Sequence, residues 1–94
     1  MPVEIVWAPL ARARLREIYA YIALDKPGAA ERLTTRIVAL VDALRHHPRL
    51  GRAGAKPGLR ELVIGGTPYV VIYQVRGNRI TINTIWHGAQ RKKR

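Results

Sequence analysis

Apolar residues recur every three or four positions in the first half of the chain, and this spacing predicts two amphipathic helices. The first helix is expected over residues 9–24, on an apolar stripe formed by Ala11, Leu15, Ile18 and Ile22. The second begins at Pro27 and ends before Pro48, and its stripe consists of Ala30, Leu33, Ile37, Leu40, Val41 and Leu44. Pro27 disfavours helical geometry at the residue before it, so the chain turns there. We therefore expect an antiparallel helical hairpin.

In the second half of the chain, the pattern of apolar residues repeats every two positions. Residues 59–64, 69–75 and 79–86 are predicted to be strands, joined by a turn at 65–68 and a tight hairpin at Gly77-Asn78. These strands should form a three-stranded antiparallel meander. Residues 49–58 contain three Gly and are expected to form an exposed loop. Residues 3–7 are mostly β-branched or aromatic and suit a strand ahead of the first helix.

The order β-α-α-β-β-β predicts an α+β fold in which the helical hairpin packs on a small antiparallel sheet. The strand at 69–75 is apolar on both faces, as expected for a central strand: Tyr69, Val71, Tyr73 and Val75 share one face. The helices should cover one side of the sheet and leave the other partly open. We expect function to reside on that open side.

Charge is divided unevenly along the chain. Residues 1–50 hold 8 Lys or Arg against 5 Asp or Glu, whereas residues 51–94 hold 9 against 1, for a net charge of +11. Glu61 is the only acid of the second half. Such a field favours encounter with phosphate backbones or with an acidic protein segment.

Length and composition indicate which kinds of protein this chain can be. The 94 residues suit a single domain over 1–94, with 91–94 a basic tail. The chain has no Cys, and its apolar runs are far too short to span a membrane. The amino terminus does not resemble a secretory signal, so a cytoplasmic protein is the simplest interpretation. The three His residues lack a complementary set of carboxylates, so no metal site is expected, and no cofactor is implied.

Several segments, taken in order, resemble the RelE/ParE superfamily of toxins from type II toxin-antitoxin pairs. They are Trp7-Ala8-Pro9, Ile18-Tyr19-Ala20-Tyr21-Ile22, Pro27-Gly28-Ala29-Ala30, Pro48-Arg49-Leu50-Gly51-Arg52, Gly58-Leu59-Arg60-Glu61-Leu62, Tyr69 to Val75, and His87-Gly88-Ala89-Gln90. The resemblance implies a toxin that arrests growth and is neutralised in a hetero-oligomer by a cognate antitoxin. A chain of net charge +11 suits an acidic antitoxin, and the helical hairpin is a plausible docking surface for it.

The superfamily divides by target, and the first possibility is a RelE-like endoribonuclease that cuts mRNA on the ribosome. The catalytic candidates would then be Arg60, Glu61 and His87. Two departures weaken this interpretation. Val70 stands where such nucleases often have an Arg, and no Tyr follows Tyr73.

The second possibility is a ParE-like toxin, which inhibits DNA gyrase by binding and needs no catalytic residue. The middle strand and the His-Gly ending are closer to this branch, so whether the protein is an enzyme stays open, with a binding inhibitor favoured. The candidate target-binding residues are Arg52, Arg60, Tyr73, His87, Gln90 and Arg91. Each has a structural alternative: Arg60 could be an ordinary surface charge, Tyr73 a core aromatic and His87 a turn residue. A third possibility is a toxin of reduced potency that persists as a corepressor with its antitoxin.

Overall fold

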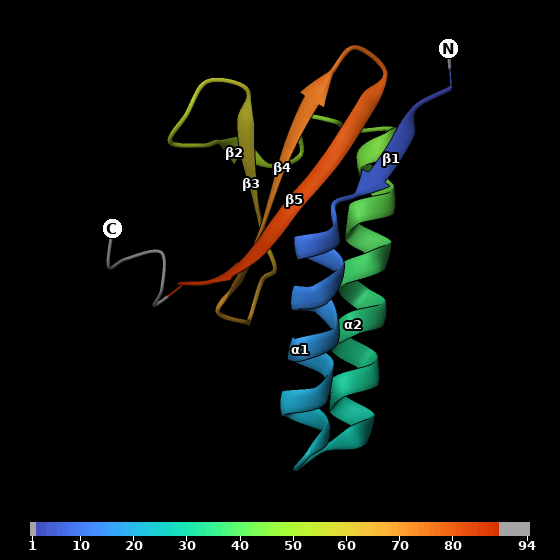
Figure 1. Cartoon of the computed structure of the whole chain (residues 1–94), viewed down its shortest axis with the longest axis vertical. Coiled ribbons are helices and arrows are strands. Elements are labelled where there is room, and N and C mark those ends of the chain that lie inside the picture. The colour runs from blue at the N-terminus through green and yellow to red at the C-terminus, as the bar shows by residue number, and fades with distance from the viewer. Residues whose placement is uncertain (1, 89–94) are drawn as a thin grey trace.

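The computed structural model describes residues 2–88 and shows a helical hairpin packed on one face of a five-stranded sheet (Figure 1). In chain order the elements are β1 (Glu4–Trp7), α1 (Pro9–Ala23), α2 (Pro27–Asp42), a 3-10 turn η1 (Ala43–Arg45), β2 (Arg52–Ala53), β3 (Leu59–Val63), β4 (Tyr69–Arg76) and β5 (Arg79–His87). The predicted α+β class and helical hairpin are confirmed.

Both helices begin at proline, whose fixed φ and missing N–H suit the first helical turn. The second helix is shorter than predicted. Its α-helical part ends at Asp42, and the chain tightens into η1 before it reaches Pro48. This is a common way for a helix to end, because a 3-10 turn satisfies some of the last carbonyl groups.

The sheet has the strand order β1-β5-β4-β3-β2. The predicted antiparallel meander of β3, β4 and β5 is confirmed. The sheet as a whole is mixed rather than antiparallel, because β1 lies parallel to β5, with Glu4 opposite Arg79 and Trp7 opposite Ile82. The loop expected over 49–58 contains the two-residue strand β2, which pairs with β3.

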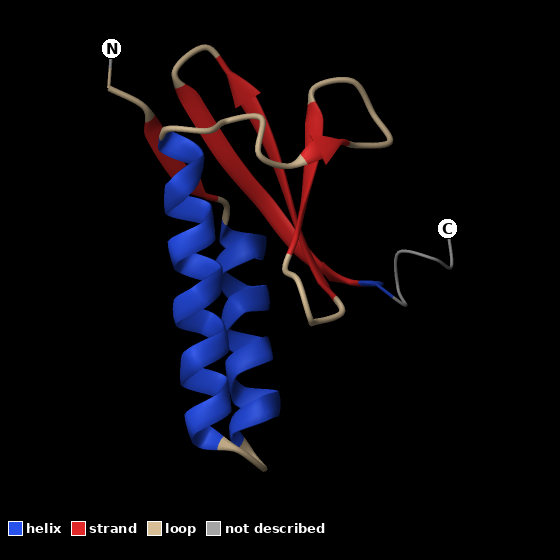
Figure 2. Ribbon diagram, turned by 180° about the vertical axis from the view of Figure 1, so that it is seen from behind, coloured by secondary structure: helices blue, strands red, loops and turns tan. Residues whose placement is uncertain are grey.

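The core lies between the hairpin and the sheet. Figure 2 shows from behind how these two layers face each other. The helices contribute Ala11, Ile18, Ile37 and Val41, and the sheet contributes Leu62, Val71, Tyr73, Ile80, Ile82 and Ile85. The residues of β4 predicted to share one face do so, with Tyr69 and Val75 packed at the border of this cluster. No helix among residues 2–88 is long and apolar enough to cross a bilayer.

An irregularity in the pairing of β4 with β5 determines which side chains of β5 face the core. The pairing of β4 with β5 shifts between Ile72 and Tyr73: Ile72 lies opposite Thr84, but Tyr73 lies opposite Ile82, so Asn83 is an additional residue on β5. Such a bulge bends the strand and restores the in-out alternation on either side of it. It lets Ile82 and Ile85 both face the core, although they are three positions apart.

Candidate functional site

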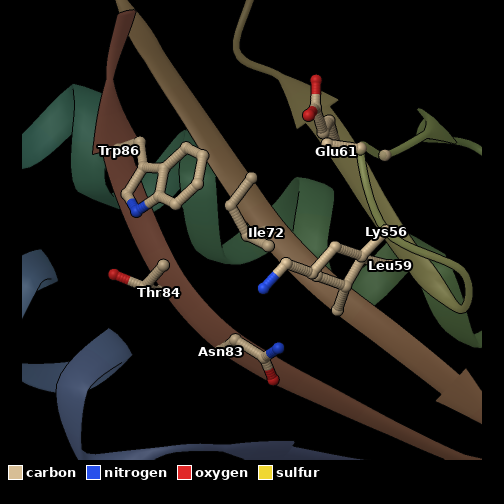
Figure 3. A pocket seen from close by; sticks show the side chains of 9 residues that line it. Lys56, Leu59, Glu61, Ile72, Asn83, Thr84 and Trp86 are labelled. Carbon is tan, nitrogen blue, oxygen red and sulfur yellow. The ribbon is translucent and has the colours of Figure 1, made fainter. Parts of the chain in front are cut away.

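The face of the sheet opposite the helices holds a pocket of about 590 Å³ (Figure 3). Ile72 of β4 lies at its centre, with the indole of Trp86 on one side and the side chains of Leu59 and Lys56 on the other. Glu61, Asn83 and Thr84 add polar groups, and Gly54 and Ala55 of the neighbouring loop complete the lining. This open-face pocket is therefore an apolar hollow with a cationic group at its border, as partner-binding sites often are.

Glu61 occupies the polar end of the open-face pocket. Its carboxylate accepts a hydrogen bond of 3.2 Å from Nε of Arg52, which lies opposite it on β2. The Glu61 side chain is only 10 % exposed, whereas that of Arg52 is 59 % exposed. The short strand β2 thus brings an exposed cation next to the pocket and neutralises a mostly buried acid.

Tyr73 lies on the opposite, helix-facing side of β4 and is 0 % exposed. Its hydroxyl accepts a 2.8 Å hydrogen bond from the Gly51 N–H and donates one of 2.8 Å to the carbonyl of Pro48. Burial raises the pKa of Tyr73, although the bond to Gly51 and the charge of Arg60 act in the other direction. The structure therefore places Tyr73 in the core, where it offers no surface to a target.

Arg60 also forms contacts within the chain. It sits opposite Tyr73 in the β3–β4 ladder, and its Nη1 donates a 2.7 Å hydrogen bond to the carbonyl of Gly51. Together with the two bonds of Tyr73, this contact attaches residues 48–51 to the sheet. We call the set formed by Pro48, Gly51, Arg60 and Tyr73 the loop latch. Arg60 is half-buried, so only part of its guanidinium remains for a partner.

His87 ends β5 opposite Tyr69, and the two rings meet edge to face with centroids 5.6 Å apart at 88°. They line a second, smaller hollow of about 330 Å³ between the end of the sheet and α1. Tyr21 and Ile18 of α1 form its other wall. Burial, and then the proximity of the Tyr21 phenol, raises the pKa of Tyr69. Tyr21 lies in the segment Ile18-Tyr19-Ala20-Tyr21-Ile22 that resembles the toxin family, but it was not among the candidate site residues.

The three candidates for nuclease chemistry do not converge. Arg60 and Glu61 are neighbours on β3 and therefore point to opposite faces of the sheet. Arg60 and His87 share a face, but they lie opposite Tyr73 and Tyr69, which are four residues apart on β4 and thus separated by roughly 13 Å. A site built from all three would need a different strand register.

Of the remaining candidate target-binding residues, one lies in the described part of the chain and two lie outside it. Arg52 is exposed beside the open-face pocket. Gln90 and Arg91 lie outside the described residues. Among residues 2–88, no group of three or more His, Asp or Glu side chains stands close enough together to hold a metal ion.

Comparison with known proteins identifies the family. Residues 5–92 match the model of the ParE toxin of type II toxin-antitoxin system, parDE. The chain is 41 % identical to toxin Y4kP of Sinorhizobium fredii over 87 residues, which cover 93 % of this chain and 90 % of that protein. It is 38 % identical to toxin RelE2 of Caulobacter vibrioides, again over 87 residues, or 93 % and 97 % of the two chains.

Solved structures agree with this assignment. A chain of the chromosomal ParDE system of P. aeruginosa superposes with a TM-score of 0.82 at 27 % identity, covering 90 % of this chain and 95 % of that one. The RelBE2 toxin-antitoxin complex of Mycobacterium tuberculosis contains the same fold, with a TM-score of 0.68 at 18 % identity and coverage of 93 % and 99 %. The chain belongs to the ParE toxin family of type II toxin-antitoxin systems.

Proposed function

We propose that this toxin arrests growth by binding DNA gyrase and stabilising an abortive complex of gyrase with DNA, and that a cognate acidic antitoxin neutralises it. Residues 1–94 would act as one toxin domain in the cytoplasm, where gyrase and DNA are found. The chain uses no cofactor in this scheme, because inhibition by binding requires surface complementarity and no bond-making step.

The separation of Arg60, Glu61 and His87 is the observation that carries the choice of a binding inhibitor. General acid-base cleavage of RNA needs its groups within hydrogen-bonding reach of one phosphodiester. Here Arg60 is engaged in the loop latch, Glu61 lies on the other face beside Arg52, and His87 packs on Tyr69. These side chains support a stable surface better than they support catalysis.

The open-face pocket and its cations are the contact surface we assign to the target. Arg52 and Lys56 are exposed at its border, next to the apolar centre formed by Ile72 and Trp86. Aromatic and arginine side chains around an apolar centre are typical of the anchoring regions of protein interfaces. Gln90 and Arg91, which lie outside the described residues, are further contacts that we assign to gyrase or its DNA, since residues 91–94 carry four cations.

The antitoxin partner follows from family membership and charge. A chain with 17 Lys or Arg and 6 Asp or Glu repels other basic proteins and attracts an acidic segment. The hairpin exposes apolar side chains that such a segment could cover, and this burial would offset the entropy lost when it becomes ordered.

A RelE-like, ribosome-dependent mRNA endoribonuclease is the second candidate. Two relatives favour it by name: toxin RelE2, and toxin RelE1 of the same organism, which is 30 % identical over 94 residues. Its catalytic candidates would again be Arg60, Glu61 and His87. In that case the double substitution Arg60→Ala with His87→Ala should abolish cleavage of ribosome-bound mRNA.

The deciding experiment is induced expression without antitoxin, with pulse-labelled DNA and protein synthesis followed over the first minutes. An early fall in DNA synthesis, with translation maintained, supports gyrase inhibition. An early fall in translation while DNA synthesis continues contradicts it and favours the nuclease. A matched culture carrying an allele of gyrase selected for survival should lose the DNA effect only if gyrase is the target.

A further inference from the structure

Two consecutive residues of β5 line the open-face pocket together. In a regular strand, neighbouring side chains point to opposite faces of the sheet. Asn83 is the additional residue of the bulge between β4 and β5, and Thr84 follows it opposite Ile72. Both line the pocket beside Ile72, because a bulge re-aims the side chains next to it. The pocket thus receives an amide and a hydroxyl that regular pairing would have placed on opposite faces.

The hydroxyl of Thr84 has no hydrogen-bond partner among residues 2–88, although only 7 % of the residue is exposed. Figure 3 shows this hydroxyl turned away from Ile72. A buried hydroxyl without a partner costs free energy, and native structures seldom contain one without a specific reason. Rotation about the Cα–Cβ bond exchanges the hydroxyl with the methyl group, since both are attached to Cβ. A ligand in the pocket can therefore gain a hydrogen bond that the free protein does not make.

The walls of the open-face pocket suit a flat, apolar ring. Ile72 and Leu59 present aliphatic side chains, and the indole of Trp86 lies on the other side of Ile72 from Leu59 (Figure 3). The volume of about 590 Å³ is in the range of sites for small ligands. Asn83 adds a planar amide, which offers a donor and an acceptor to the edge of a nucleobase. Proteins hold unpaired bases with this combination of aromatic, aliphatic and amide groups.

The charge at the border of the pocket favours a phosphate. Lys56 is exposed, and Figure 3 shows its amino group reaching toward Ile72 from the loop that precedes β3. It forms no ion pair within the part of the chain that the structure describes. Glu61, the acid of the pocket, is joined to Arg52 at 3.2 Å, so this pair contributes little net charge. The positive charge of Lys56 therefore remains to attract an anion.

A second hollow adjoins the open-face pocket beneath the same loop. It has a volume of about 380 Å³ and shares with the pocket the residues Gly54, Ala55, Lys56 and Leu59. Arg60 is also part of its lining. A strand of nucleic acid with one base in the pocket can continue along this basic hollow, whereas a single nucleotide uses only the pocket. The two hollows together therefore favour a strand.

We propose that the open-face pocket binds one unpaired nucleobase together with its phosphate. The base lies against Trp86 and Ile72. The Asn83 amide and the rotated Thr84 hydroxyl bind its edge, and Lys56 binds the phosphate. The inference rests on the proposed function in treating this pocket as part of the target surface, and it adds that the pocket contacts an unpaired base of the DNA. A single strand and a free nucleotide present the same base and phosphate, so the two sources need separate measurements.

Two DNA strands separate recognition of the base from attraction by charge. In the first, a short fluorescent strand, every sugar lacks its base except the central one, which carries adenine. The second lacks that adenine as well and presents the same phosphates, so it measures charge alone. Fluorescence anisotropy with the purified toxin should show the adenine strand bound about tenfold more tightly. Trp86→Leu should reduce this difference to less than about threefold, because the aromatic surface is lost. Lys56→Gln should weaken both strands by a similar factor, since a phosphate contact does not depend on the base.

Thr84→Val should change stability and binding in different directions. Valine keeps the shape and removes a hydroxyl that the free toxin leaves unpaired, so the variant should unfold at the same or a higher denaturant concentration. Its affinity for the adenine strand should fall about threefold or more, while its affinity for the strand without bases stays unchanged. Thr81→Val, on the same strand but outside the pocket, is the matched control and should change neither affinity. Equal affinities of Thr84→Val and the wild type for the adenine strand would remove Thr84 from the site.

Competition with deoxyadenosine monophosphate identifies the source of the base. If the free nucleotide displaces the adenine strand with an affinity equal to that of the strand, the pocket is a nucleotide site. If the free nucleotide is about tenfold weaker or more, the neighbouring phosphates contribute and the ligand is a strand, as we expect. Both results support the base pocket.

Further outcomes distinguish failure of the inference from failure of the proposed function. Equal affinity of the wild-type toxin for the two strands, or an equal loss for both in Trp86→Leu, would overturn the base pocket, because charge alone would then explain binding. Inhibition of purified gyrase without any dependence on the base would leave the proposed function standing and show the inference to be wrong. Binding of the base by a toxin that stops translation before DNA synthesis would support the pocket and contradict gyrase as the target.

Discussion

The backbone N–H of Gly51 donates a 2.8 Å hydrogen bond to the hydroxyl of Tyr73, which lies 22 residues further along the chain. The same hydroxyl donates to the carbonyl of Pro48, and Arg60 donates to the carbonyl of Gly51. The loop latch therefore satisfies three backbone groups of a segment that has no regular hydrogen-bonded structure of its own. Several residues of the segments that resemble the toxin family thus hold the fold together.

Tyr73→Phe should lower the free energy of unfolding by about 1–3 kcal/mol. The ring remains packed, but the Gly51 N–H and the Pro48 carbonyl lose their partner in the interior. Chemical denaturation measures this effect. Tyr19→Phe, at an exposed position of α1, is the matched control and should change stability by less than about 0.5 kcal/mol.

Gly51→Ala adds only one methyl group, but it should lower the free energy of unfolding considerably. A Cβ at this position would lie 2.7 Å from Cε1 of Tyr73 and 2.8 Å from the carbonyl oxygen of Glu61. Tyr73 is held by the loop latch and the Glu61 carbonyl by the backbone of β3, so we expect a loss of about 2 kcal/mol or more in denaturation experiments. Gly65→Ala is the control, because the nearest atom to its Cβ would be the flexible end of Arg36 at 3.4 Å. Comparable losses for the two variants would show that the latch is not tight.

The free energy of unfolding should decrease at alkaline pH because Tyr73 and Tyr69 ionise less readily in the folded protein than in the unfolded chain. The pKa of each is raised above the ordinary value of 10.0 in the folded protein, chiefly by burial. Below pH 10 both states keep the proton and the full stability is present. As pH rises past 10 the unfolded chain ionises first, and stability is lost until the folded pKa is reached. Denaturation between pH 8 and 11 should show this decrease, and Tyr73→Phe should reduce its slope.

Lys56→Glu should weaken inhibition of the target without affecting folding. Lys56 is exposed at the border of the open-face pocket, and reversing its charge opposes association with gyrase or its DNA. The measurement is the concentration of toxin that stabilises cleaved DNA in a purified gyrase reaction, which we expect to rise about tenfold. Arg32→Glu makes the same change of charge at an exposed position of α2, on the side of the sheet that the helices cover, and should have a smaller effect. Equal effects of the two would mean that overall charge, rather than the pocket, controls binding.

Removal of residues 91–94 tests the basic tail. The truncation deletes four cations, and if they contact DNA in the gyrase complex, toxicity should fall and the salt dependence of binding should become shallower. Growth after induction and gyrase inhibition at two salt concentrations measure both effects. Unchanged toxicity of the truncated chain would remove the tail from the target-binding surface.

Local patterns predicted most of the elements, because each depends on neighbours in the sequence. The stripes at Ile18 and Ile37 follow from helical periodicity, and the meander follows from alternation interrupted by Gly77-Asn78. The parallel pairing of β1 with β5 leaves no local signal, since Glu4 and Arg79 are 75 residues apart. The shortening of α2 was missed for a different reason, because a 3-10 turn keeps nearly the same apolar spacing.

The candidate site was harder to predict than the fold. Alternation shows that Arg60 and Glu61 face opposite ways, but it does not show which face the helices cover. Tyrosine is a common residue type at binding sites, which is why Tyr73 was a candidate. The hydrogen-bond partners of its hydroxyl are backbone groups of Pro48 and Gly51, which only the tertiary fold brings close. The hollow between α1 and the end of the sheet combines Tyr21 with Tyr69 and His87 from the other half of the chain, so no single segment of the sequence indicates it.

The strand order makes assembly depend on the end of the described chain. β5 is the last strand to be synthesised among residues 2–88, yet it lies between β1, the first, and β4. A growing chain can form its helices early, because their contacts are local, whereas β1 has no partner until residue 79 onward is available. The sheet therefore cannot be completed during translation until residues 79–87 have been synthesised, and β1 and β4 stay on separate edges until then.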